Sequence, residues 1–167
     1  EAEFRTKRTN VWMASGTAAL PHGAWAKLED KDRVIEPGTP YVLMGDGSWS
    51  GDSTGIIALT VEERPHLTVV DLWERPDDDN GWRVPVADVE QAFRTTCAET
   101  SVLEVGMDPY RWQRSMQVLE NEGLPMVEFP MGSPARMISA WQTFYDLVMD
   151  QGFTHDGDPR MARNVEA

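Results

Sequence analysis

Two aspartates stand where apolar runs of the sequence end. Asp46 lies in a segment rich in glycine and serine, residues 45–55, between two apolar runs, and Asp108 directly follows the apolar run Val102–Met107. Carboxylate oxygens are the ligands that the hard cations Mg²⁺ and Mn²⁺ prefer. A fold that brings these two strand ends together would therefore create a divalent-metal site from Asp46 and Asp108.

Each aspartate also has a purely structural interpretation. Asp46 precedes Gly47, and Asp-Gly is a common turn pair. Asp108 precedes Pro109, and an aspartate in that place commonly caps a helix whose first turn holds the proline. Capping does not exclude metal binding, because a carboxylate has several lone pairs. The spatial convergence of the two side chains would separate these alternatives.

The composition predicts one folded domain with a short appendage. The chain has 167 residues, of which 41% are hydrophobic, and seven tryptophans, which is enough for one substantial core. No apolar stretch approaches the roughly 20 residues that cross a bilayer, so we expect a soluble, intracellular protein with no membrane partner. The single cysteine, Cys97, excludes an internal disulfide framework and a thiolate zinc cluster.

The net charge of −13 argues against a protein that holds DNA by static electrostatics, because counterion release from phosphates needs clustered lysine and arginine. A bound divalent cation would change that balance locally. Three arginines near the proposed site are candidate phosphate contacts: Arg111, Arg114 and Arg136.

Apolar runs predict three consecutive strands over residues 41–44, 55–61 and 66–73. Their short connections favour an antiparallel meander. A fourth strand is predicted over 102–107 and a fifth over 126–129. The helix between the third and fourth strands is predicted by apolar residues at three- and four-residue steps: Val86, Val89, Phe93 and Cys97.

Two more helices are predicted from a capping residue followed by proline, one after Asp108 and one after Ser133. Gly123 and Gly152 are expected to end them. Their apolar stripes are Trp112, Met116 and Leu119 in the first, and Met137, Trp141, Phe144 and Val148 in the second. We expect these tryptophans and methionines to lie in the core. The predicted fold is α/β, with a mixed five-stranded sheet covered by helices.

This order, with acids at the ends of the first and fourth strands, resembles the ribonuclease H-like fold, in which those two strands lie side by side. A closer resemblance is to the nuclease domain of phage terminase large subunits, over roughly residues 38–167. It rests on the order and spacing of several short segments: Gly45–Ser48, Asp52–Thr54, Trp82–Pro85, Met107–Pro109 with Trp112, Val127–Pro130 and His155–Pro159.

The resemblance implies an endonuclease that cleaves double-stranded DNA concatemers during genome packaging. Two divalent ions, Mg²⁺ or Mn²⁺, would promote phosphodiester hydrolysis, with Asp46 bridging both ions and Asp108 holding one. The family's third acidic ligand usually follows the segment around His155, on a later helix, and we expect it beyond Ala167. Asp156 and Asp158 are the candidate substitutes within the chain. An incomplete set of ligands predicts weak cleavage.

The resemblance also implies a wider assembly. Residues 1–37 would be the linker from an upstream ATPase domain, and residues 38–167 the nuclease domain, truncated at its C-terminus. Portal protein and the small terminase subunit would be partners, and the cytoplasm of a bacterial host the location. His155 is expected to be structural or exposed, because no other metal-type ligands accompany it.

Two other functions compete with the nuclease. An actin-like nucleotide-binding half-domain would also carry an aspartate and a Gly-Ser pair near the first hairpin, but such ATPases need two facing domains and this chain has room for one. A non-catalytic docking module for a portal or capsid, with an acidic surface that meets a basic partner, is the second alternative. Metal binding at Asp46 would separate the nuclease from both.

Overall fold

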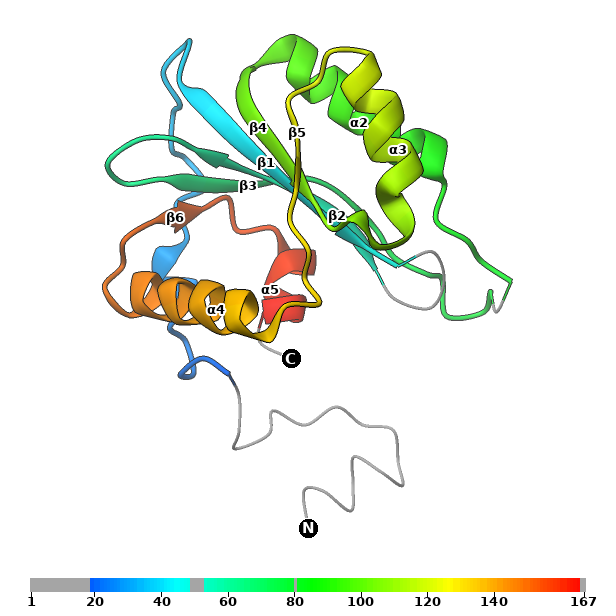
Figure 1. The fold of residues 1–167 in the computed structure, drawn as a ribbon. Coiled ribbons are helices and arrows are strands. Elements are labelled where there is room, and N and C mark those ends of the chain that lie inside the picture. The colour runs from blue at the N-terminus through cyan, green and yellow to red at the C-terminus, as the bar shows by residue number, and fades with distance from the viewer. Residues whose placement is uncertain (1–18, 49–52, 80, 166–167) are drawn as a thin grey trace.

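A computed structural model describes residues 19–48, 53–79 and 81–165. Its centre is a six-stranded mixed sheet with the strand order β5-β4-β1-β2-β3-β6, and helices cover both faces (Figure 1). The strands are β1 (Pro40–Gly47), β2 (Thr54–Thr60), β3 (His66–Trp73), β4 (Ser101–Met107), β5 (Met126–Glu128) and β6 (Thr154–His155). The helices are η1 (Ala26–Leu28), α2 (Val86–Glu99), α3 (Pro109–Asn121), α4 (Pro134–Met149) and α5 (Pro159–Val165).

The predicted α/β fold is confirmed, including the antiparallel meander and the alternation of helix and strand after it. β1 pairs antiparallel with β2, which pairs antiparallel with β3, while β4 lies parallel to β1 and β5 parallel to β4. The sixth strand, β6, was not expected, because its two residues are too few to show a period. It extends the sheet by pairing parallel with β3.

One face of the sheet is covered by α2 and α3, and its core is apolar. Helix α3 buries Trp112, Met116 and Leu119, as the stripe predicts, and α2 buries Val89 and Phe93. These side chains meet Leu43, Ile56, Ala58, Val105 and Met107 from the strands. The half-buried Cys97 packs at the border of this cluster, where burial raises the pKa of its thiol.

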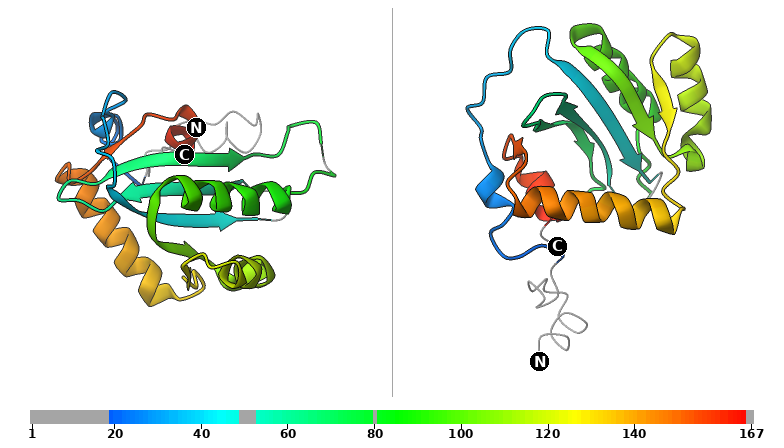
Figure 2. Two further views of the ribbon diagram at one scale, coloured as in Figure 1. Left: turned by 90° about the horizontal axis from the view of Figure 1, so that it is seen from above. Right: turned by 60° about the vertical axis from the view of Figure 1, so that its left-hand side comes forward.

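The opposite face carries α4, α5 and the segment before β1, which Figure 2 shows from two further directions. Residues 1–18 of the predicted linker lie outside the described part of the chain. The remainder, residues 19–37, contributes Leu20, Trp25 and Leu28 to the second core, together with Leu67, Val148 and Phe153. This part of the predicted linker is thus packed against the sheet, and the domain boundary at residue 37 stays a prediction.

His155 is a structural residue of this second core. Its side chain is 2% exposed, its ring stacks on Trp25 with centroids 4.1 Å apart, and its Nε2 lies 3.0 Å from the Trp25 carbonyl oxygen. The Gly157 amide donates to Nδ1 at 3.0 Å. Both ring nitrogens therefore have protein partners, and the histidine fixes the N-terminal segment to β6.

Helix α4 departs from the prediction, because much of its apolar stripe is not in the core. Val148 is buried, but Trp141 is 48% exposed and Ile138 is 70% exposed. The expected core position of Trp141 is therefore wrong. The N-terminal half of α4 extends past the sheet rather than lying across it, which is the reason for this exposure (Figures 1 and 2). Helical spacing predicted the helix but not the length of sheet available beneath it.

The end of α4 also differs from the expectation that Gly152 terminates it. The helix ends at Met149, and Gln151 takes the left-handed conformation at φ 53°. The Gly152 amide then donates to the Leu147 carbonyl oxygen at 2.8 Å. Gly152 is needed for a different reason, since a Cβ there would lie 2.7 Å from the Leu147 side chain.

None of the helices within the described residues has both the length and the apolar character that a membrane span requires.

Candidate metal centre

The parallel register of β1 and β4 brings Asp46 and Asp108 to the same end of the sheet, at the C-terminal ends of these two strands. The last register pair is Gly45 opposite Met107, so the next residue on each strand is one of the two aspartates. Neighbouring strands lie about 4.8 Å apart, and adjacent residues on parallel strands share a face. The convergence that the sequence left open is thus a consequence of strand order β4-β1.

Both aspartates point to the face of the sheet that carries α4. Gly45 and Met107 face α2, because a Cβ on Gly45 would lie 2.7 Å from Phe93 Cζ and Met107 is part of the α2–α3 core. Side chains alternate along a strand, and Asp108 keeps an extended backbone at φ −69° and ψ 122°. Asp46 is exposed and Asp108 is half-buried, so solvent reaches both carboxylates.

Asp108 is held by backbone amides from two segments. Its Oδ1 accepts from the Tyr110 amide at 3.0 Å, which confirms its predicted place as the N-cap of α3. Its Oδ2 accepts from the Met131 amide at 3.2 Å, in the loop after β5. Each oxygen keeps a lone pair beyond these bonds, so the cap and a metal-binding role are compatible.

Trp112 connects the two aspartate-bearing segments. Its indole Nε1 donates to the Gly47 carbonyl oxygen at 3.0 Å, and its side chain is 1% exposed. This bond ties α3, four residues after Asp108, to the residue directly after Asp46. The sequence indicated Trp112 only as a core residue, because nothing in helical spacing reveals which acceptor an indole N–H will find.

A side-chain hydrogen bond connects the two sides of the hairpin after Asp46. The Thr54 hydroxyl donates to the Ser48 carbonyl oxygen at 3.0 Å. Gly47 allows this close approach, since a Cβ there would lie 2.5 Å from the Thr54 side chain. The other residues of the predicted acidic loop, 49–52, including Asp52, lie outside the described part of the chain.

The candidate third acids are not beside the pair. Asp156 follows β6 and Asp158 precedes α5, at the sheet edge that β2 and β3 separate from β1. Asp156 accepts from the amides of Val69 and Asp158, at 2.8 and 3.0 Å. A hydrogen bond from Arg160 lowers the pKa of the Asp158 carboxyl. Both aspartates therefore organise the turn into α5. Over residues 19–48, 53–79 and 81–165, no group of three or more metal-type side chains gathers.

Glu128 is an acid near Asp108 that was not among the predicted site residues. It stands opposite Met107 at the end of β5, and it lines a pocket of about 580 Å³ together with Asp108, Tyr110 and Gln113. The signal that singled out Asp46 and Asp108, an acid at a strand end, also applies to Glu128. The missing information was that β5 lies parallel beside β4.

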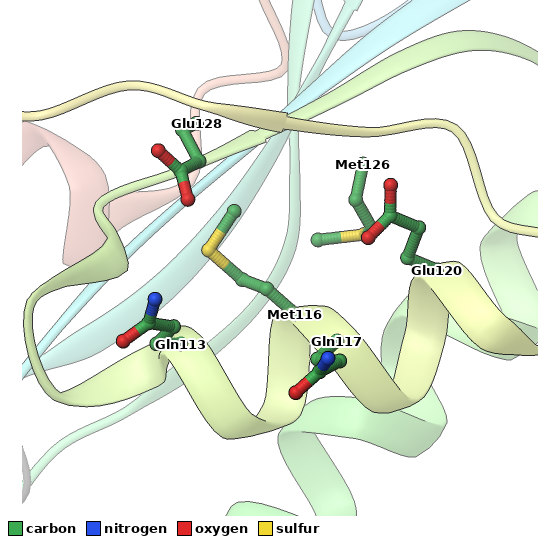
Figure 3. A pocket seen from close by; sticks show the side chains of 6 residues that line it. All are labelled: Gln113, Met116, Gln117, Glu120, Met126 and Glu128. Carbon is green, nitrogen blue, oxygen red and sulfur yellow. The ribbon is translucent and has the colours of Figure 1, made fainter.

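A second pocket of about 320 Å³ adjoins the first and shares Gln113 and Glu128 with it. Figure 3 shows it between α3 and β5, with Met116 and Met126 between the polar side chains. Gln117 and Glu120 complete its lining from α3. The two pockets together form a depression that runs along α3 to Asp108.

The fold is similar to solved structures of large terminases. The HK97 bacteriophage large terminase matches with a TM-score of 0.72 and 14% sequence identity, over 88% of this chain and 36% of the other. The large terminase nuclease from thermophilic phage G20c matches with a TM-score of 0.62 and 14% identity, over 91% and 78% of the two chains. The same nuclease with bound magnesium gives a TM-score of 0.57, again with 14% identity, over 91% and 77%.

These likenesses show that the chain has the fold of large terminase nuclease domains, as the motif resemblance predicted. At 14% sequence identity, these matches show a similarity of fold alone. The match spans about a third of the HK97 chain. No protein-family model matches the sequence, and a search of curated proteins finds no match either.

Proposed function

We propose that this chain is a divalent-metal-dependent endodeoxyribonuclease, the nuclease domain of a phage DNA-packaging terminase large subunit. Its substrate would be double-stranded DNA concatemers, and Asp46 and Asp108 would be its metal ligands. The observation that supports the proposal is the parallel register of β1 and β4, in which Asp46 and Asp108 follow directly after the paired residues Gly45 and Met107 and are both accessible to solvent.

The donor set fits Mg²⁺ or Mn²⁺. Mg²⁺ is commonly bound by one or two carboxylates plus water and substrate phosphate, rather than by a full protein cage. Asp46 is exposed, and Asp108 retains lone pairs after its two amide bonds. When bound, a pair of divalent ions activates water and stabilises the leaving oxygen of a phosphodiester. Asp46 would hold both ions and Asp108 one of them.

The protein's own contribution is to keep the two carboxylates in place. The Tyr110 and Met131 amides fix the orientation of the Asp108 carboxylate, and the Trp112 indole fixes the strand end next to Asp46. Rigid placement of ligands matters because small displacements of a catalytic group cost much of its effect. The described residues supply two acids where the resemblance expects three, so we expect weak metal binding and slow cleavage by this chain.

The wider context is part of the same proposal. An upstream ATPase domain, a portal protein and a small terminase subunit would be the partners in the bacterial cytoplasm. The fold likeness to the HK97 large terminase supports this context.

Metal binding is the direct test. At a Mn²⁺ concentration about ten times the Kd, binding to the folded state alone should raise the melting temperature by about 3–6 °C. We expect this rise for the wild type, and a smaller or absent rise for Asp46→Asn and Asp108→Asn. The control is Asp32→Asn, an exposed aspartate near β6, which makes the same change in charge. Differential scanning fluorimetry measures all four proteins.

An equal response of the wild type and Asp46→Asn to Mn²⁺ would contradict the nuclease and favour a docking module. Plasmid cleavage in Mn²⁺ gives a second readout. Slow nicking by the wild type that Asp46→Asn abolishes would support the proposal, and nicking that persists in Asp46→Asn would point to a contaminating enzyme.

A further inference from the structure

Two arginine side chains lie over aromatic rings in the two segments whose backbone amides bind Asp108. The Arg111 guanidinium stands 5.2 Å from the centroid of the Tyr110 ring, and that of Arg136 stands 5.3 Å from the centroid of the Phe129 ring. Tyr110 belongs to the start of α3, while Phe129 follows β5. The two stacks therefore come from different elements that meet at the aspartate.

Both stacks adjoin the same pocket, one through Tyr110 and the other through Pro130. Tyr110 lines the pocket of about 580 Å³ that also contains Asp108. Arg136 donates through Nη1 to the carbonyl oxygen of Pro130, another lining residue, at 3.4 Å. Asp108 itself accepts from the backbone of both segments, at Tyr110 and at Met131. Backbone amides of both arginine-bearing segments thus bind the proposed metal ligand, Asp108.

The backbone at Arg111 is strained. Arg111 has φ 68° and ψ −16°, a left-handed conformation that residues other than glycine rarely adopt, and Tyr110 before it is also non-helical with ψ 114°. This irregularity interrupts the first turn of α3 directly after Asp108. Strained residues outside glycine concentrate at functional sites, where the surroundings hold them in place. The Tyr110 side chain, 70% exposed, projects at the same point.

The pairing of these arginines differs from that of others in the described part of the chain. Arg33, Arg94, Arg160 and Arg163 each form ion pairs with carboxylates. Over the described residues, Arg111 and Arg136 have aromatic partners and no carboxylate within ion-pair distance. Neither guanidinium is held in an ion pair by a carboxylate of the described residues, and both belong to segments that contact Asp108, in a protein whose net charge is −13.

We propose that Arg111 and Arg136 form a clamp that binds backbone phosphates of duplex DNA on the two sides of the site at Asp108. This inference rests on the proposed nuclease function and assigns its positioning residues. A guanidinium binds phosphate through paired N–H donors while its flat face stays on a ring, so the stacks preorganise both groups. Preorganisation lowers the entropy that binding would otherwise cost. The clamp would offset the repulsion between DNA and this acidic chain.

The test is DNA binding as a function of salt, measured by fluorescence anisotropy of a labelled duplex in Ca²⁺. The slope of log K against log salt falls by about 0.9 for each phosphate that the protein no longer neutralises. Arg111→Gly, in which glycine accepts the left-handed backbone, and Arg136→Ala should each lower the slope by about 0.9, and the double variant by about 1.8. Mn²⁺ should still raise their melting temperature as in the wild type.

Arg64→Ala is the matched control. Arg64 is exposed and lies in the β2–β3 turn, at the opposite end of the strands from Asp46, and its removal makes the same change in charge. An unchanged slope in Arg64→Ala together with a reduced slope in the double variant supports the clamp.

If the wild type binds DNA and the double variant binds with the same affinity and slope, the clamp is overturned while the nuclease proposal stands. If the wild type binds no duplex at any salt concentration, both are overturned. Replacement of both arginines by lysine should preserve the slope but weaken binding. Full retention of affinity would show that the stacks have no part in it.

Discussion

Helices α3 and α4 begin with similar sequence signals and have different places in the fold. Each follows a capping residue and has proline as its first residue, and each has apolar residues at helical spacing. Trp112 of α3 is 1% exposed, whereas Trp141 of α4 is 48% exposed. Helix α3 packs against the sheet, but the first half of α4 is largely exposed. The comparison teaches that an apolar stripe predicts a helix without predicting what covers it.

The same contrast holds at both helix ends. Asp108 accepts an amide bond as the cap of α3, whereas the side chain of Ser133 makes no capping bond at the start of α4. Gly123 follows the end of α3 with φ 98°, while Gln151 takes the corresponding left-handed position after α4. Helix α3 is therefore the more strongly specified of the two, and it is the helix that carries the proposed site.

The largest expected difference is between the two tryptophans. Trp112→Ala should lower the free energy of unfolding by about 3–5 kcal/mol, because it leaves a cavity in the core and removes the bond to Gly47. Trp141→Ala should cost less than about 1.5 kcal/mol, since it loses mainly the contact with the Phe144 ring. Urea denaturation measures both. Equal losses would show that α4 is covered in solution.

The helix caps should differ by a smaller amount. Asp108→Ala should cost about 1–2 kcal/mol, because the Tyr110 and Met131 amides both lose their acceptor. Ser133→Ala should change stability by less than about 0.5 kcal/mol. Asp108→Asn is the control, because asparagine keeps one acceptor oxygen for the Tyr110 amide without the charge. A large effect of Ser133→Ala in urea denaturation would mean that its hydroxyl does cap α4.

The smallest effects are expected after the helix C-termini, and they should have opposite signs. Gly123→Ala should destabilise by about 1 kcal/mol through backbone strain alone, since a Cβ there meets nothing within 4 Å. Gln151→Gly should stabilise by roughly 0.5 kcal/mol, because glycine relieves the left-handed strain but is freer when unfolded. Thermal unfolding would show the two shifts, and equal signs would refute this account of the helix ends.

Much of the candidate site has local signals in the sequence. Asp46 and Asp108 end apolar runs, and the Asp-Pro pair marked the start of α3 correctly. Glu128 and the hydrogen bond from Trp112 to Gly47 were not predicted, because both depend on which strands and helices become neighbours. The stacks of Arg111 and Arg136 likewise depend on loop conformations that have no periodic signal.

The sequence alone determined the α/β class, the order of the elements and the two acids at strand ends, because periodicity and turn residues act over a few neighbours. Tertiary structure decided that β4 lies beside β1, that Asp156 and Asp158 lie by the edge strand β6, which β2 and β3 separate from β1, and that α4 is left partly uncovered. These outcomes depend on how whole elements share the available surface. That competition for buried area involves contacts between residues far apart along the chain, and no local pattern encodes it.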